Sequence, residues 1–198
     1  MIVFIMSLML QMFSNVVLIG DSHLRTITQR DFRTFNGSVS IFCEPGSGIE
    51  YVEYIMAELD WREYGDTQPD TIMLLTGGND LDKSYYVDVK RLVARMVQVA
   101  DEARLLGAKL IIMEQFPRPG ARYGGVNYQT NRLWFEHLLI EALPSNARYW
   151  RWDTTLRINA PDFLKPDGVH FRMSRRRKVA RYLMTGMIFA VNWRRWQS

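Results

Sequence analysis

Short apolar runs that stop at glycine recur along this chain and set narrow limits on its fold. The first, residues 16–20 (VVLIG), is followed directly by Asp21 and Ser22. Runs of the same form occupy residues 38–46, 71–78 and 109–116, and residues 148–153 form a weaker fifth. Continuous apolar runs of this length that end in a turn signal are typical of strands buried on both faces of a parallel sheet.

Segments with helical periodicity separate these predicted strands. Apolar residues recur every three or four positions in residues 49–59, 89–103, 131–142 and 179–191. Each segment therefore presents one apolar stripe to a sheet. Strands that alternate with helices form right-handed β-α-β units, so we predict an α/β fold with a mostly parallel sheet and helices on both faces. In such sheets the reactive groups gather at the carboxyl ends of the strands.

The length of 198 residues and the hydrophobic content of 47%, without repeats or a linker, indicate one globular domain. We assign residues 1–15 to an apolar N-terminal extension, residues 16–192 to the domain and residues 193–198 to a short basic and aromatic tail. Residues 1–13 lack the basic start and the cleavage site of a signal peptide. We therefore favour an intracellular protein, with secretion as the alternative if residues 1–13 act as a signal. No run reaches the roughly 18–20 apolar residues that span a bilayer.

Cysteine and histidine, which often act as catalytic residues or metal ligands, are scarce in this sequence. Cys43 is the only cysteine, which excludes an internal disulfide and any metal site built from several cysteines. It lies in the second predicted strand, where we expect an inert core residue. His137 lies within a predicted helix, where we expect a surface or packing role.

The ends of the predicted strands carry a set of residues suited to nucleophilic acyl transfer. Ser22 follows the first strand, and a serine hydroxyl becomes a good nucleophile when a base within hydrogen-bond reach accepts its proton. His170 is the best candidate for that base. Asp167, three residues earlier, can fold back and accept the other imidazole N–H, which fixes the tautomer and stabilises the imidazolium.

The oxyanion of such a reaction needs hydrogen-bond donors that are already in place. We expect them to be the backbone N–H groups of Ser22 and Gly48 and the side-chain amide of Asn79. The loss of one such donor typically lowers the rate ~10²–10³-fold.

Residues near these strand ends are candidates for substrate binding. We assign this role to His23, Asp80, Arg122 and Tyr123, with His23 at the mouth of the pocket or in solvent. The loop of residues 117–131, which also contains Arg118, has two interpretations. It forms a flexible wall of the substrate site, or it is an exposed connection with solvated arginines.

Four short blocks of the sequence resemble those of the SGNH (GDSL-type) hydrolases. They are residues 20–22 (GDS), Gly48, residues 77–80 (GGND) and residues 167–170 (DGVH), in the order of that family. The resemblance covers roughly residues 16–191. It implies a flavodoxin-like, three-layer α/β/α sandwich with a five-stranded parallel sheet, and serine esterase or lipase chemistry with no metal and no organic cofactor.

The sequence departs from this family at three positions. His23 stands where an apolar residue is common, and Arg172 and Arg175 stand where a small polar residue or glycine is expected. These departures bear on the start of the last helix and on the shape of the acyl pocket. A weaker resemblance, carried by GDSHLR, GGNDL, VNYQTN and DGVHF, is to stand-alone SGNH domains associated with animal mobile elements.

Two functional hypotheses of different classes follow. The first is a serine ester hydrolase that forms an acyl-enzyme with a small-molecule or glycan ester. Because no long apolar lid is evident, we expect short acyl groups such as acetyl. The alternative is a mobile-element-associated binding module with weak or no activity, whose basic C-terminus contacts nucleic acid or an anionic membrane.

The basic C-terminus itself has more than one interpretation. Residues 172–198 contain eight basic and no acidic residues, so the net charge of +4 comes from this segment. A packing face of Val179, Leu183, Met187 and Val191 would leave the arginines in solvent. The cluster at residues 175–178, with Trp193 and Trp196 nearby, would also suit phosphate contacts and base stacking, or an anionic membrane surface.

Overall fold

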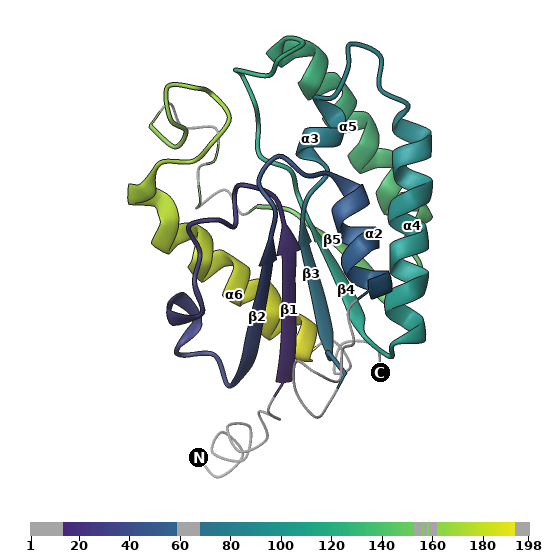
Figure 1. Cartoon of the computed structure of the whole chain (residues 1–198), viewed down its shortest axis with the longest axis vertical. Helices are drawn as coiled ribbons and strands as arrows, with labels where there is room; N and C mark the ends of the chain where they lie inside the picture. Colours follow the sequence, from purple (N-terminus) through teal and green to yellow (C-terminus); the bar gives the residue numbers. More distant parts are fainter. Residues whose placement is uncertain (1–13, 59–67, 153–155, 157, 159–161, 193–198) are drawn as a thin grey trace, which may run out of the picture.

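A five-stranded, all-parallel sheet in the order β2-β1-β3-β4-β5 organises the chain in our computed structural model (Figure 1). The structure describes residues 14–58, 68–152, 156, 158 and 162–192. The strands are β1 (Ser14–Gly20), β2 (Gly37–Cys43), β3 (Thr71–Leu75), β4 (Lys109–Met113) and β5 (Ala147–Trp150). All five predicted strands are therefore present, and the prediction of a parallel sheet is confirmed.

The strand order reverses at β1, and this reversal fixes where a site can form. The chain passes from β1 to its neighbour β2 and then returns across the sheet to β3, which pairs with the other side of β1. In register, Gly20 pairs with both Cys43 and Leu75, so the carboxyl ends of these three strands lie level. In open α/β sheets a crevice opens where the order reverses, outside the carboxyl ends of the two strands involved. Here those strands are β1 and β3.

Helices cover both faces of the sheet (Figure 1). One face carries α2 (Ile49–Glu58), α4 (Val89–Leu105) and α5 (Gly125–Ala142), and the other carries α6 (Arg176–Asn192) with the 3-10 helix η1 (Gln29–Phe32). Two short elements, α3 (Gly78–Leu81) and η3 (Met173–Arg175), lie in the connections.

Each layer of helices has its own apolar core because successive strand residues point to opposite faces. Leu18 and Met73 belong to the core under α6, whereas Ile19 and Leu74 belong to the core under α2 and α4. The fold is thus the three-layer α/β/α sandwich that the resemblance implied.

The second strand is less buried than its sequence predicts. β2 lies at the edge of the sheet, where it has a neighbour on one side only, and Val39 is its one fully buried residue. Cys43 is accordingly half-buried rather than a core residue. Burial, together with the nearby carboxylates of Asp21 and Glu44, raises the pKa of its thiol to about 11. It therefore stays a thiol at neutral pH, and its Sγ lies 3.1 Å from the Asp21 carbonyl.

Two boundaries also differ from the predictions. β1 begins at Ser14, so residues 14 and 15 belong to the sheet rather than to the N-terminal extension. α5 begins at Gly125, six residues before the predicted helix, because Gly124 turns the chain with a φ of 95°. Residues 1–13 and the tail at 193–198, with Trp193 and Trp196, lie outside the described residues. Within residues 14–192, as far as they are described, no helix is long and apolar enough to cross a membrane.

Candidate active site

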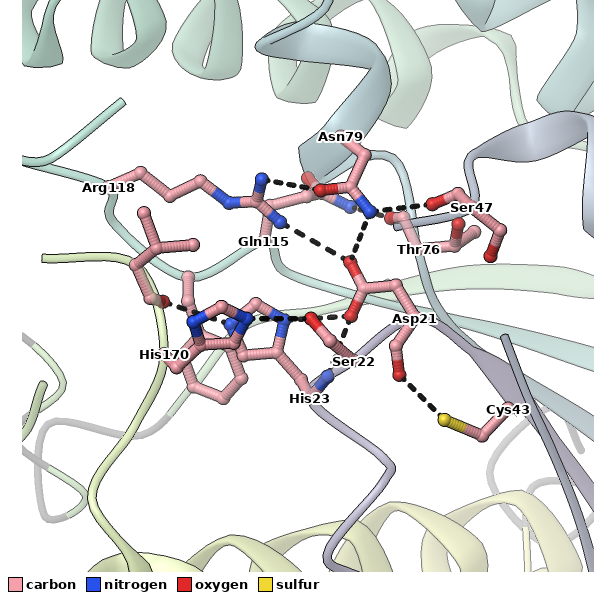
Figure 2. A network of polar contacts seen from close by, with 12 residues as sticks. Asp21, Ser22, His23, Cys43, Ser47, Thr76, Asn79, Gln115, Arg118 and His170 are labelled. Atoms are coloured by element: carbon pink, nitrogen blue, oxygen red, sulfur yellow. Dashed lines mark hydrogen bonds and ion pairs between the residues drawn. The ribbon is translucent and has the colours of Figure 1, made fainter. Parts of the chain in front are cut away.

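Ser22 and His170 meet at the carboxyl end of β1 although 148 positions separate them in sequence. Ser22 is the second residue after β1, and its Oγ lies 3.0 Å from His170 Nε2 (Figure 2). His170 belongs to the segment that leads into η3 and α6. Both side chains line a cavity of about 610 Å³. A histidine nitrogen at this distance can accept the serine proton.

Asp167 holds the other side of the His170 ring. Its Oδ2 lies 3.0 Å from His170 Nδ1, and its Oδ1 accepts the backbone N–H groups of Val169 and His170, both at 2.9 Å. Partial burial alone would raise the pKa of Asp167, but these backbone and imidazole hydrogen bonds outweigh it and lower the pKa to about 2. The ionised carboxylate draws the proton to Nδ1, which leaves Nε2 as an acceptor for the Ser22 hydroxyl.

The two further residues expected to bind an oxyanion lie around the same cavity. Gly48 immediately precedes α2 and lines the cavity together with Asn79. A Cβ at Gly48 would lie 2.4 Å from Asp80 Oδ1, so a larger residue there would have to displace the Asp80 carboxylate. Asn79 lies in α3, just after β3, and its Nδ2 donates to the Ser47 carbonyl at 2.7 Å. The structure therefore brings together Ser22, Gly48, Asn79 and His170, which the sequence predicts to act together.

The residues assigned to substrate binding have different positions. Asp80 and Arg122 line the cavity, whereas Tyr123 is not among the described residues that line it. His23 is buried, with 4% of its surface exposed, so the expectation of a solvated residue is wrong, although His23 lines a small cavity of about 170 Å³ together with Ser22 and His170. Consecutive side chains diverge at this turn, so Ser22 faces the cavity while the ring of His23 lies in the interior, 4.9 Å from the ring of Phe116.

Arg118 lines the cavity, as expected if the loop of residues 117–131 forms a wall of the site, and the alternative of a solvated arginine is wrong for this residue. It is buried, with 4% of its surface exposed. Its Nη1 donates to Asn79 Oδ1 at 2.8 Å, and its Nη2 donates to Asp21 Oδ2 at 3.3 Å (Figure 2). The one signal in the sequence is the position of Arg118 after the fourth strand, at the edge of the sheet where Ser22 and Asn79 also lie.

Asp80 has a buried carboxylate that accepts the backbone N–H of Ile49 at 3.0 Å. Burial and the neighbouring charge of Glu50 raise the pKa of Asp80 to about 6. The folded state therefore binds a proton more tightly than the unfolded state, and stability falls as the pH rises from about 4 to about 6. Above that range the full penalty of an ionised buried group applies.

We expect Asp80→Asn to increase the free energy of unfolding at pH 7.5 by up to about 3 kcal/mol, because asparagine stays neutral and its Oδ1 still accepts the Ile49 N–H. At or below pH 4 the variant and the wild type should be nearly equal. Urea unfolding at both pH values measures the difference. A variant that is less stable than the wild type at pH 7.5 would contradict the raised pKa.

The basic residues near the C-terminus are partly used within the fold. Arg175 forms an ion pair with Asp162, and Arg176 forms one with Asp31 at 2.7 Å. Arg172 donates to the Leu164 carbonyl at 2.8 Å.

The predicted packing face of α6 is confirmed. It consists of three buried residues, Val179, Leu183 and Met187, and the partly buried Val191. The exposed basic residues of this helix are Arg177, Lys178 and Arg181. His137 lies on the surface of α5, 3.6 Å from Glu141, as expected.

The ion pairs of Arg175 and Arg176 give these arginines a structural role. They also lower the positive charge that is available to a nucleic acid or a membrane surface. Two of the four residues at 175–178 are used in this way. The described part of the chain offers no observation that favours contact with nucleic acid or with a membrane surface. In the same part of the chain, no three or more histidine, cysteine, aspartate or glutamate residues are grouped so that they could hold a metal ion.

The chain has the fold of the GDSL-like lipases and acylhydrolases, which confirms the resemblance to SGNH hydrolases at the level of fold. Its sequence matches no protein-family model and no curated protein sequence. The structure is similar to a GDSL-like lipase from Bacteroides thetaiotaomicron, with a TM-score of 0.69, 16% identity and 89% coverage of both chains.

Two further solved structures are similar over most of their length. A lipase/acylhydrolase from Enterococcus faecalis has a TM-score of 0.63 and 17% identity, with 88% of this chain and 95% of that chain covered. The acetyl xylan esterase AlAXEase has a TM-score of 0.65 and 15% identity, with 87% of this chain and 98% of that chain covered. At these identities the likeness establishes the fold.

Proposed function

We propose that this protein is an SGNH/GDSL-type serine ester hydrolase that acts through an acyl-enzyme. The observation that carries the proposal is the hydrogen-bonded series Ser22–His170–Asp167, with distances of 3.0 Å at both steps, at the edge of a cavity. Nucleophile, base and orienting carboxylate in this order are the three parts that serine acyl transfer needs. The fold shared with lipases and esterases supports the same conclusion.

The reaction follows from these positions. Nε2 of His170 takes the proton of Ser22 as Oγ attacks the ester carbonyl carbon, and the carbonyl oxygen becomes the oxyanion. The backbone N–H groups of Ser22 and Gly48 and the amide of Asn79 stabilise that charge. His170 then gives its proton to the departing alcohol, which leaves an acyl group on Ser22. Water, activated by the same histidine, releases the acid and restores the hydroxyl.

The lining of the cavity favours a short acyl group on a polar alcohol. Among the fourteen lining residues, Pro45 and Val169 are the only ones with apolar side chains that could pack on a chain. A longer acyl chain gains about 0.8 kcal/mol per methylene only where it leaves water for an apolar surface. Polar and charged side chains instead suit the hydroxyl groups of a sugar. A similar structure, AlAXEase, is an acetyl xylan esterase.

A phosphonate ester with a p-nitrophenol leaving group tests the proposed nucleophile. We expect it to release one equivalent of p-nitrophenol and to leave a covalent adduct on the peptide that contains Ser22, as detected by mass spectrometry. The His170→Ala variant should react much more slowly, because the hydroxyl then has no base. An adduct on another residue, or none at all, would contradict the proposal.

The proposed preference for short acyl groups can be tested separately. With p-nitrophenyl acetate, butyrate and octanoate, we expect kcat/KM to fall at least about tenfold from acetate to octanoate, since only Pro45 and Val169 offer the longer chain an apolar side chain. Release of acetate from acetylated xylan, followed by chromatography, extends the test to a sugar ester. A higher kcat/KM for octanoate would show that the acyl group binds elsewhere, against an apolar surface.

A further inference from the structure

Arg118 reaches from the loop after β4 into the floor of the proposed active site. It lies 39 positions from Asn79 and 97 positions from Asp21 in the sequence, yet its guanidinium group donates to both side chains. We propose that Arg118 is a positioning residue that holds the amide of Asn79 with its N–H groups toward the oxyanion. This inference rests on the proposed function.

The side-chain amide of Asn79 can take two orientations, and only one of them presents an N–H group to the oxyanion. Turned by half a rotation, its oxygen would face the oxyanion and repel it. A guanidinium group can only donate hydrogen bonds, so Arg118 at 2.8 Å requires the oxygen of Asn79 on its own side. On the other side, the Ser47 carbonyl and Asp21 Oδ2 lie 2.7 and 3.4 Å from Nδ2, and both only accept. These neighbours together select the orientation in which Nδ2 is available as a donor.

The long contact between Nδ2 and Asp21 matters because it leaves one N–H of Asn79 weakly held. At 3.4 Å this hydrogen bond is weak, whereas the 2.7 Å bond to Ser47 is strong. Arg118 donates to the same Asp21 Oδ2 at 3.3 Å and so supplies that oxygen with another partner. This weakly held N–H can therefore also donate to a developing oxyanion while Arg118 and the Ser47 carbonyl keep the amide in place.

Asp21 is the counter-ion that keeps Arg118 in place. The side chains of both residues are 3% exposed. Burial alone would raise the pKa of Asp21, but the charges and hydrogen bonds of His23 and Arg118 outweigh it and lower the pKa, so the carboxylate is ionised. On the far side of this carboxylate, His23 Nδ1 lies 2.8 Å from Oδ1, and its Nε2 lies 3.1 Å from the carbonyl of Val169, the residue before His170.

The network therefore joins the oxyanion side of the site to the segment that carries the base. It runs from Asn79 through Arg118 and Asp21 to His23 (Figure 2). From there it continues to the carbonyl of Val169. The contacts of Arg118 with Asn79 and of His23 with Asp21, both at 2.8 Å, have the length of strong hydrogen bonds, whereas the contact of Arg118 with Asp21 is longer, at 3.3 Å. They are suited to hold the donors and the base in fixed positions relative to Ser22.

The surroundings of Arg118 suit a flat guanidinium group. A Cβ on Gly78 would lie 2.5 Å from Nη2, so the group packs directly on the backbone of α3 beside Asn79. Its Cζ also lies 5.6 Å from the centre of the Tyr128 ring. A lysine ammonium is a single point of charge and cannot donate to Asn79 and Asp21 in the same fixed geometry.

A double-mutant cycle tests the inference, with Arg118→Met, Asn79→Ala and the two combined. With p-nitrophenyl acetate we expect Arg118→Met to lower kcat about 10- to 100-fold and to change KM by less than about threefold, because the oxyanion forms only in the transition state. In the Asn79→Ala background, Arg118→Met should have no further effect on kcat. Effects that multiply in the double variant would overturn the inference, as would a wild-type kcat in Arg118→Met.

Arg132→Met is the matched control. Arg132 is 6% exposed and donates to Glu114 Oε1 at 2.7 Å, but it does not line the cavity. Its removal should destabilise the fold and leave kcat per folded molecule unchanged. Should Arg118→Met not fold, Arg118→Lys keeps the charge beside Asp21 and should show the same loss of kcat and the same non-additivity. No Ser22-dependent turnover in the wild type would overturn the proposed function together with this inference.

Discussion

Ser22→Ala is expected to lower kcat for p-nitrophenyl acetate by about 10⁵- to 10⁶-fold. The reason is that Oγ of Ser22 is the atom that bonds to the acyl carbon, and no other hydroxyl lies against His170 Nε2 in the described structure. What remains without it is attack by water, helped by the oxyanion donors alone. Steady-state rates of the purified variant, with circular dichroism and thermal unfolding to confirm its fold, measure the loss.

Ser38→Ala is the control for this substitution. Ser38 lies in β2 at the opposite end from the site, where its Oγ donates to Asn15 Oδ1 at 2.6 Å. It should keep the full rate, because it removes a serine hydroxyl of the same chain without touching the cavity. If the folded Ser22→Ala variant hydrolysed the ester as fast as Ser38→Ala, the nucleophile would have to be another group and the proposed mechanism would fail.

The sequence was sufficient to predict the parts of the site that depend on topology. Parallel strands carry their carboxyl ends to one edge, so the residues that follow β1 and β3, Ser22 and Asn79, had to lie near each other. Asp167 and His170 are three positions apart, which is close enough for a local turn to pair them. These predictions needed strand positions and short-range spacing, and both can be recognised in a single sequence.

Burial that depends on distant segments could not be predicted in this way. An arginine in a loop rich in glycine and proline is usually solvated, and only the folded chain brings the carboxylate of Asp21 to Arg118. His23 likewise follows the nucleophile in sequence, but its buried partners, Asp21 and the Val169 carbonyl, come from two segments. The exposure of β2 follows from its place at the sheet edge, which depends on the order of all five strands.

Asp167→Asn should lower kcat by about 10⁴-fold although it changes one oxygen to nitrogen. Oδ1 of the asparagine would still accept the backbone N–H groups of Val169 and His170, as Asp167 does at 2.9 Å. Its amide nitrogen would then face His170 Nδ1 and donate to it, which drives the ring proton to Nε2. That nitrogen could no longer accept the proton of Ser22, so the nucleophile would lose its base while the geometry stays intact.

Rates with p-nitrophenyl acetate between pH 5 and 9 measure this effect, beside Asp162→Asn as the control. Asp162 is an exposed carboxylate on the same segment, but its partner is Arg175 rather than the histidine. The wild-type carboxylate of Asp167, with a pKa of about 2, stays ionised across this whole range. The loss in Asp167→Asn should therefore persist at every pH where the wild type is active, because it arises from the tautomer of His170 and not from the charge state of Asp167. A variant that recovers the wild-type rate at any of these pH values would show that the carboxylate is dispensable for orienting the base.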